Sequence, residues 1–370
     1  MNSTRSPSPS ERIAWLRLAR TQNVGPVTFA ALVERFGSAS AALKELPRLA
    51  RRGGAAADLR IPTPADAERE FEAIARIGAR LIVSCDDDFP RGLAALEAPP
   101  PVIVVLGHPE ILSREMIAVV GARNASALGR KFAAELAAGL GNAGLVVVSG
   151  MARGIDTAAH EGALESGTVA VLAGGVDDVY PPENARLYER IVRDGAAVSE
   201  MPVGQSPQAK HFPRRNRIIS GLARGVVIVE AAEGSGSLIT ANFALEQGRE
   251  VFAVPGSPLD PRAKGTNRLL RDGAALTESA EDVLEVLRPL IGAGFREPDQ
   301  SSSAWCAGAY EQVDDKVRRD VEELLGPAAV PVDELVRRSG APANVVLSVL
   351  LELELAGRLH RESGNRVALG

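Results

Sequence analysis

A basic segment that contains no acidic residue is the clearest chemical signal in this sequence. Between Gln208 and Arg224 the chain carries five Lys or Arg side chains, together with the aromatic ring of Phe212. Because proline is favoured in the first turn of a helix, a helix is predicted to begin near Pro213, with Lys210 and Phe212 just before its positive end. Proteins that bind a single nucleic-acid strand combine cations, which contact the phosphate backbone, with aromatic rings, on which bases stack.

The members of this segment are not all expected to point outward. Arg214 and Arg217 are three residues apart and should share one helix face, whereas one arginine of residues 214–217 can point into the fold to hold Asp156 or Glu230. Phe212 fits two roles, a stacking platform or a core anchor. The alternative for the whole segment is a solvated basic face. Surface ion pairs contribute only about 0 to 1 kcal/mol, so stability alone explains such a face poorly.

Small residues gather where the predicted strands end. Backbone N–H groups in glycine turns can approach an anion closely, and the carboxyl ends of parallel strands lie along one edge of a sheet. Several of the turns also carry an arginine or a serine, as Arg123, Ser126 and Arg153 show. The sequence therefore predicts a polar pocket shaped for phosphate. The turns are residues 121–126, 149–156, 173–175, 230–240 and 255–257.

Other chemistries are poorly supported. Asp156 and His160 are four residues apart, but no nucleophile or third ligand accompanies them, so they are expected to cap and pack. The sequence has no G-x-x-x-x-G-K-[ST] motif, and the turn at Gly234 lacks the third glycine of the dinucleotide fingerprint. Cys85 and Cys306 are too far apart to suggest a zinc site. No cofactor and no metal are expected.

The elements that must position these groups are short buried strands alternating with helices. Uninterrupted apolar runs are typical of parallel strands that helices cover on both faces. This pattern predicts a doubly wound, Rossmann-like α/β domain with a mostly parallel sheet over residues 79–291. The runs are residues 102–106, 116–120, 145–148, 168–172, 225–229 and 250–254.

The N-terminal flank is predicted to be helical. Residues 1–10 are rich in Ser and Pro and are expected to be a disordered tail, and residues 11–78 are assigned to a helical domain. A Gly-Pro turn at Gly25 precedes an apolar-periodic helix that Gly37 closes, which predicts a helix-hairpin-helix (SAM-like) unit. Such a turn can offer N–H groups to a phosphate or simply pack. The packing role is favoured because turn chemistry alone is a weak signal.

The C-terminal flank is predicted to be a winged helix. Residues 292–312 form a linker, and residues 313–370 contain three helical patterns followed by a hairpin. The third helix carries Glu352 and Glu354 and has no Lys or Arg between Gly340 and Gly357. A helix that reads DNA needs basic groups, so a structural or protein-contact role is favoured.

Bulk composition sets limits on location and partners. The net charge of −5 gives no long-range attraction to nucleic acid, so any DNA site must be local. No run approaches the roughly 18 apolar residues of a spanning helix. Charged residues interrupt any signal-peptide core near Ile13, and the protein is expected in the cytoplasm without a membrane partner.

Read together, the motifs resemble the DNA-processing protein A (DprA, also called Smf) family. The resemblance extends over roughly residues 80–285 and includes the lead-in at residues 86–90. It rests on six segments that are more specific together than any single glycine pattern. They are residues 121–126, 149–160, 171–181, 212–221, 230–241 and 251–256.

This resemblance implies a protein that binds single-stranded DNA without sequence preference and is not an enzyme. It further implies a homodimer formed through the Rossmann-like domain and assistance in loading the RecA recombinase during natural transformation. The site residues implied by the motifs and turns are Gly121, Arg123, Ser126, Ser149, Gly150, Arg153, Gly174, Gly175, Lys210, Phe212, Arg214, Arg215, Asn216, Arg217, Gly234, Ser235, Gly236 and Ser237.

One enzyme class also resembles this core, the Rossmann-like nucleoside-monophosphate phosphoribohydrolases. Their hydrolysis depends on a carboxylate shortly after a Gly-Gly-x-Gly-Thr turn. The equivalent stretch here, from Gly234 to Asn242, contains no carboxylate, and the first that follows is Glu246. The pocket is therefore expected to hold phosphate without cutting a glycosidic bond.

Overall fold

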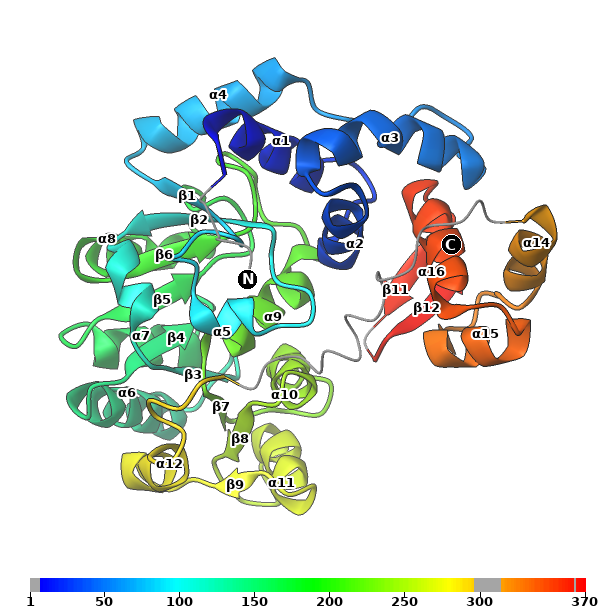
Figure 1. Ribbon diagram of the computed structural model, residues 1–370. Coiled ribbons are helices and arrows are strands. Elements are labelled where there is room, and N and C mark those ends of the chain that lie inside the picture. The colour runs from blue at the N-terminus through cyan, green and yellow to red at the C-terminus, as the bar shows by residue number, and fades with distance from the viewer. Residues whose placement is uncertain (1–6, 296–313, 363) are drawn as a thin grey trace. The chain divides into compact units, whose positions relative to one another are not determined.

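The computed structural model describes residues 7–295, 314–362 and 364–370, which divide into two compact units (Figure 1). Residues 70–96 and 102–295 form the first unit, and the other described residues, which are residues 97–101 and those of the N-terminal and C-terminal flanks, form the second. The predicted tail and linker fall largely on residues 1–6 and 296–313, outside the described residues.

The first unit is built on a mostly parallel sheet, as predicted. All six apolar runs form strands, and the described strands follow the order β1-β2-β6-β5-β4-β3-β7-β8-β9. Along this order, all neighbouring strands from β6 through β3 to β9 are parallel. Strand β2 pairs antiparallel with β6, and β1 pairs antiparallel with β2. The strands are β1 (Arg80–Val83), β2 (Val102–Gly107), β3 (Met116–Gly121), β4 (Val146–Ser149), β5 (Thr168–Val171), β6 (Ala196–Ser199), β7 (Gly225–Val229), β8 (Glu250–Ala253) and β9 (Ala275–Leu276).

Helices cover both faces of this sheet (Figure 1). Along β3, Ile117 and Val119 pack with α6, α7 and α12, whereas Ala118 and Val120 pack with α9 and α10. Strand order reverses between β3 and β7, the switch point at which open α/β sheets bind ligands. The helices are α5 (Arg91–Ala94), α6 (Ala127–Asn142), α7 (Ile155–Ala163), α8 (Ala185–Asp194), α9 (His211–Leu222), α10 (Gly236–Glu246), α11 (Lys264–Arg271) and α12 (Ala280–Leu287), with short 3-10 turns η1 (Pro109–Ser113), η2 (Pro182–Asn184) and η3 (Pro261–Ala263).

The basic helix α9 begins slightly earlier than predicted. Lys210 is its N-cap residue and Phe212 lies inside the first turn, not before it. Proline at position 213 is tolerated because N–H groups in the first turn need no partner within the helix. The apolar face is as expected, since Ile218, Ile219 and Leu222 are buried.

The N-terminal part of the second unit is helical, as predicted. Gly25 caps α2 before Pro26, and Gly37 ends that helix with a φ of 76°, a left-handed conformation that favours glycine. Trp15 and Phe29 pack edge to face at 4.9 Å between ring centroids. The helices are α1 (Pro9–Ala19), α2 (Pro26–Phe36), α3 (Ala39–Arg52) and α4 (Pro64–Arg76), the last of which continues into the first unit.

The C-terminal residues form the predicted winged helix. Its third helix packs on a core that includes Val349, and strands β10, β12 and β11 form an antiparallel sheet. None of the helices in the described ranges is long and apolar enough to cross a bilayer. The elements are α14 (Asp315–Glu323), β10 (Val330–Pro331), α15 (Val332–Ser339), α16 (Ala343–Leu355), β11 (Leu359–Glu362) and β12 (Arg366–Leu369).

Candidate nucleic-acid interface

Exposed cations and two aromatic rings meet where the turns after β3 and β5 approach the start of α9. The guanidinium carbon of Arg123 lies 5.2 Å from the ring centroid of Phe212. The Tyr180 ring lies on Phe212 with 5.8 Å between centroids and 64° between planes. Lys210 is exposed one helical position before this first turn. With Arg153, described next, these residues form what we call the edge cluster: Arg123, Arg153, Tyr180, Lys210 and Phe212.

Arg153 extends the edge cluster from the turn after β4. Its guanidinium pairs with the Glu183 carboxylate, which raises the pKa of Arg153, and the Tyr180 hydroxyl has a smaller effect in the same direction. Both partners are at least half exposed, so solvent screening leaves this pair worth little. Arg153 is therefore a charged side chain that a phosphate can draw away from Glu183 at small cost.

Arg214 and Arg217 share a single carboxylate. The Glu200 side chain, only 4% exposed at the end of β6, accepts from Arg214 at 3.3 Å and also pairs with Arg217. The sequence suggested unbalanced charge on this helix face, and the structure differs because Glu200 lies outside the basic segment. Arg217 is 14% exposed, whereas Arg214 keeps 44% of its side chain exposed and can still reach a ligand.

Arg215 is the arginine that points inward. It is 6% exposed, and its guanidinium donates to the Val171 carbonyl at 2.9 Å. Burial lowers the pKa of Arg215 to about 10, an effect that the nearby Asp156 carboxylate opposes. Gly150 leaves room for this guanidinium, which would have to shift if position 150 carried a Cβ. One arginine of residues 214–217 therefore points into the fold, as expected, and of the two carboxylates that it could meet, Asp156 or Glu230, it interacts electrostatically with Asp156.

The Asp156 carboxyl group accepts hydrogen bonds from backbone N–H groups that were predicted to bind a phosphate. Burial raises its pKa, while Arg215 and the backbone N–H groups of Ala152, Gly121 and Gly150 act in the opposite direction. The Ala152 N–H donates to Asp156 at 3.3 Å. The glycine turns after β3 and β4 thus close around the chain's own carboxyl group.

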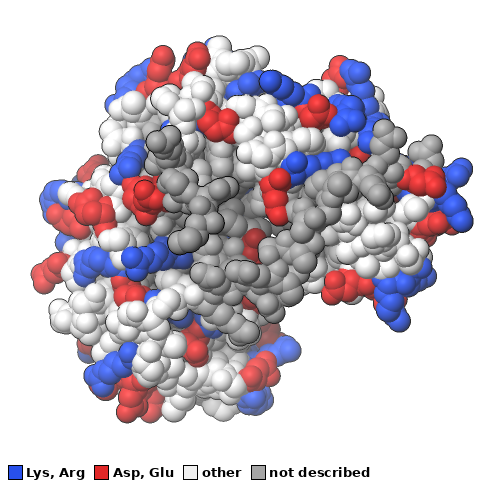
Figure 2. All heavy atoms as spheres, viewed as in Figure 1, with Lys and Arg blue, Asp and Glu red and all other residues white. Residues whose placement is uncertain are grey.

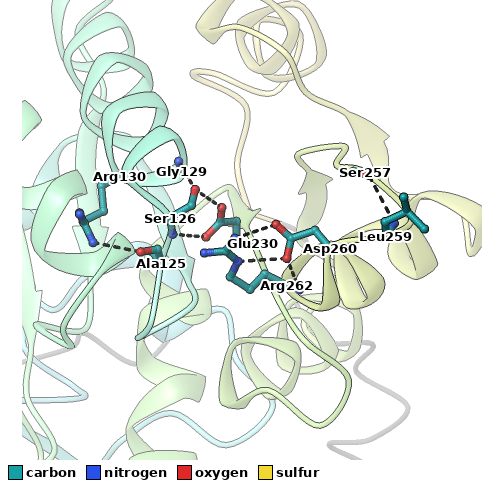
Figure 3. A network of polar contacts seen from close by, with 9 residues as sticks. All are labelled: Ala125, Ser126, Gly129, Arg130, Glu230, Ser257, Leu259, Asp260 and Arg262. Atoms are coloured by element: carbon teal, nitrogen blue, oxygen red, sulfur yellow. Dashed lines mark hydrogen bonds and ion pairs between the residues drawn. The ribbon is translucent and has the colours of Figure 1, made fainter.

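A second internal carboxylate lies at the switch point between β3 and β7. Glu230 accepts from the backbone N–H and the hydroxyl of Ser126, at 2.8 and 2.5 Å, and Ser126 also caps α6 through the N–H of Gly129. Figure 3 shows the Glu230 carboxylate pointing toward Ser126, with Arg262 on its other side held by Asp260. Glu230 has a φ of 54°, which non-glycine residues adopt rarely. The α6 N-terminus, where a nucleotide phosphate would bind in such folds, is occupied by the chain's own carboxylate.

Several other predicted site residues are placed by bonds within the fold. The Ser149 hydroxyl is fully buried and donates to the Val119 carbonyl at 2.6 Å. In the turn after β5, the N–H of Gly175 donates to Gln205 at 2.8 Å and the carbonyl of Gly174 accepts from Ser199. These hydrogen bonds fix the turns at the carboxyl ends of β4 and β5.

The turn before α10 is likewise fixed from within. Asn216, on α9, is buried and donates to the carbonyl of Gly236 at 3.2 Å, while the Ser235 hydroxyl caps α10 by accepting from the N–H of Ser237. Gly234 has a φ of 76° and is exposed. Of this predicted group, only Gly234, Ser235 and Gly236 keep appreciable surface.

Asp156 and His160 do not form a catalytic pair. The Thr168 hydroxyl donates to the Val147 carbonyl and is therefore the acceptor for Nδ1–H of His160 at 2.8 Å. Burial lowers the pKa of His160 to about 3, so the ring is neutral and packed as expected. Among the described residues, no three His, Cys, Asp or Glu side chains converge to hold a metal ion.

Sequence reasoning missed Tyr180 as a member of the site. The residue was within the segment 171–181 that carried the family resemblance, but no charge or helix placed it beside Phe212. The available signal was an aromatic ring next to Pro181 in a turn after a predicted strand, where a core role is hard to satisfy. In the structure Tyr180 is 49% exposed.

Comparison with known families decides the assignment. Residues 80–288 match the family described as DNA recombination-mediator protein A, which is more than half of the 370 residues. Residues 9–73 match the DprA-like N-terminal HHH domain and residues 307–365 the DprA winged helix domain. The chain belongs to the DprA/Smf family. Its role is therefore in DNA processing.

Individual DprA/Smf proteins support the same assignment. Protein Smf of Escherichia coli K12 is 40% identical over 295 residues, covering 78% of this chain and 77% of that protein. The solved structure of DprA from Streptococcus pneumoniae has a TM-score of 0.63 at 36% identity, over 76% of this chain and 98% of that chain. The DprA structure from Helicobacter pylori, described for its single-stranded DNA binding mode, has a TM-score of 0.54 at 26% identity, over 59% and 99% of the respective chains.

Proposed function

We propose that this DprA-family chain binds single-stranded DNA at the edge cluster, without sequence preference. The observation that carries the proposal is the grouping of Arg123 and Tyr180 on the partly exposed Phe212 ring, with Arg153 near Tyr180 and the exposed Lys210 two residues before Phe212. Cations that follow the backbone and rings that accept any base give affinity without base-edge readout. The single-stranded DNA binding mode described for the Helicobacter pylori relative supports the same ligand.

The charge distribution supports a local site on a mildly acidic protein. Figure 2 shows Lys and Arg interspersed with Asp and Glu on the face in view, without a continuous basic field, in keeping with the net charge of −5. Duplex DNA is bound chiefly through an extended array of phosphate contacts. A small cluster that includes rings favours a strand whose bases are unpaired, because only such bases can stack on Phe212.

The proposal does not include catalysis on a nucleotide. Asp156 and Glu230 occupy the positions on this sheet edge where a nucleotide phosphate would meet backbone N–H groups. A phosphoribohydrolase would need those positions open and a carboxylate aimed at the glycosidic bond. These internal carboxyl groups therefore favour a binding protein over the enzyme class that the core resembles.

Family membership also motivates proposals about partners. We infer that the protein acts in the cytoplasm as a homodimer through its Rossmann-like domain and helps to load the RecA recombinase on the bound strand. Exposed apolar side chains such as Leu259, 93% exposed, and Leu128, 79% exposed, provide surface for protein contacts. Light scattering tests the dimer, and RecA filament assembly on strands coated with this protein tests the loading.

A direct binding comparison tests the proposed function. The full chain is titrated by fluorescence anisotropy against an oligothymidylate, a mixed-sequence single strand and a duplex of equal length in one buffer. Both single strands should bind with similar affinity and the duplex more weakly. Equal affinity for duplex and single strand would overturn the proposal, as would release of free base from a nucleoside monophosphate that a pocket substitution abolishes.

A further inference from the structure

Tyr180 has surface and surroundings that a folding role does not require. It is 49% exposed, and among the described residues it is the one aromatic side chain in the set of large, exposed hydrophobic groups. A half-exposed ring contributes only part of the hydrophobic stabilisation that full burial gives. Its placement in the turn after β5 therefore calls for a ligand or a partner.

The ring belongs to the edge cluster geometrically. Tyr180 and Phe212 are inclined by 64° with centroids 5.8 Å apart, so they form an edge-to-face pair whose planes face different directions. Arg123 lies over Phe212 at 5.2 Å, and Arg153 lies within electrostatic range of the Tyr180 hydroxyl. Each ring thus has a cation beside it that can hold the phosphate of a nucleotide whose base stacks there.

We propose that Tyr180 is a second base-stacking platform, which receives an unpaired nucleobase next to the one on Phe212. This inference rests on the proposed function and deepens it, since it assigns a contact to a residue that the family motifs did not identify as a ligand. Two rings at a fixed inclination accept adjacent bases that are splayed apart, a geometry that a stacked duplex cannot offer. Because any base has a flat face, the contact is tolerant of sequence.

The test combines substitutions of Tyr180 in the protein with removal of the bases from the DNA. Wild type, Tyr180→Ala and Tyr180→Phe are titrated with an oligothymidylate and with an abasic strand of the same length, which keeps the phosphates but lacks the bases. Tyr180→Ala should weaken oligothymidylate binding about 5- to 150-fold and leave abasic binding unchanged. Tyr180→Phe should bind both strands like wild type, because stacking needs the ring and not the hydroxyl.

Leu245→Ala is the matched control. Leu245 is 59% exposed and lies near the end of α10, shortly before β8 begins. It is therefore on the side of the sheet where the parallel strands begin, whereas the edge cluster is on the side where they end. This variant should bind both strands like wild type, and thermal melts of all variants should coincide. Coinciding melts show that any loss in Tyr180→Ala is not unfolding.

The outcomes separate this inference from the proposed function. If wild type binds oligothymidylate tightly while Tyr180→Ala binds it equally well, the stacking role is overturned and the proposed function stands. If Tyr180→Ala loses the same factor on the abasic strand, the residue supports the cations and does not stack, which also overturns the inference. If wild type fails to bind either strand, the proposed function itself has failed.

Discussion

At the residue scale, buried polar groups under the edge cluster are held in a single charge state. Arg215 stays charged beside Asp156, and His160 stays neutral because burial and the Arg215 charge both oppose its protonation. Removing either Arg215 or Asp156 would take a favourable electrostatic interaction away from the other in a buried environment. These residues therefore fix the turns on which Arg123 and Arg153 are carried.

His160 should make stability depend on pH in a defined window. Its folded pKa of about 3 lies below the ordinary value of 6.5, so the unfolded chain takes up a proton that the folded chain cannot accept. Stability is retained above pH 6.5 and lost as the pH falls from about 6.5 toward about 3. Between pH 7 and pH 5 the wild type should lose about 2 kcal/mol more than His160→Gln.

Urea unfolding of both proteins at the two pH values measures this difference. The carboxylates, including Asp156, titrate in both proteins, so the comparison isolates the histidine. An identical pH dependence of the free energy of unfolding in wild type and His160→Gln would show that the ring titrates normally.

At the element scale, a carboxylate from β7 completes the N-terminus of α6. Glu230 accepts two hydrogen bonds from Ser126, and a Cβ at position 129 would force the Glu230 carboxylate to shift. A negative charge at this end of a helix is favourable. A nucleotide phosphate would have to displace the Glu230 carboxylate to bind at this N-terminus.

Replacing Glu230 should both destabilise α6 and open an anion site. Glu230→Ala should lower the free energy of unfolding by about 1.5 to 3 kcal/mol, the range for a hydrogen bond to a charged group. Added inorganic phosphate should raise the melting temperature of this variant more than that of wild type, because the ion can take the vacated position. Equal phosphate responses in the two proteins would contradict the assignment of Glu230 as an internal anion.

Helices and strands could be predicted from the sequence where a local pattern of residues marked them. Unbroken apolar runs gave six strands, and the Gly37 and Pro26 signals gave α2. Strand β6 was missed because Ala-Ala-Val-Ser is short and alanine favours strands weakly. Because β6 was not predicted, Glu200 could not be placed beside α9. Its ion pairs with Arg214 and Arg217 could therefore not be predicted either.

At the scale of the whole molecule, the third helix of the winged helix, α16, carries two acidic residues and no Lys or Arg. Both acidic residues of α16 are paired with arginines, Glu352 with Arg318 and with Arg52 of α3, and Glu354 with Arg361. The sequence showed that this helix lacks cations, while the partners of its carboxylates depend on tertiary contacts. The proposed binding site therefore lies in the first unit.

Deleting residues 313–370 should leave affinity for single strands within a few-fold of the full chain. The edge cluster lies entirely in the first unit, so its cations and rings are kept. Circular dichroism melts check that the shortened protein folds, and anisotropy titration measures its affinity. Loss of most binding by a well-folded truncation would show that the winged helix takes part in holding DNA.

The salt dependence of binding to oligothymidylate tests the edge cluster most directly. Each phosphate neutralised on a single strand contributes about 0.7 to the slope of log affinity against log salt. Lys210→Ala and Arg123→Ala should each weaken binding and flatten that slope by about one contact, whereas Arg193→Ala should not. Arg193 is 71% exposed in the last turn of α8, before β6 begins and at the far edge of the sheet. Unchanged slopes for Lys210→Ala and Arg123→Ala, with wild-type melts, would contradict the placement of the strand at the edge cluster.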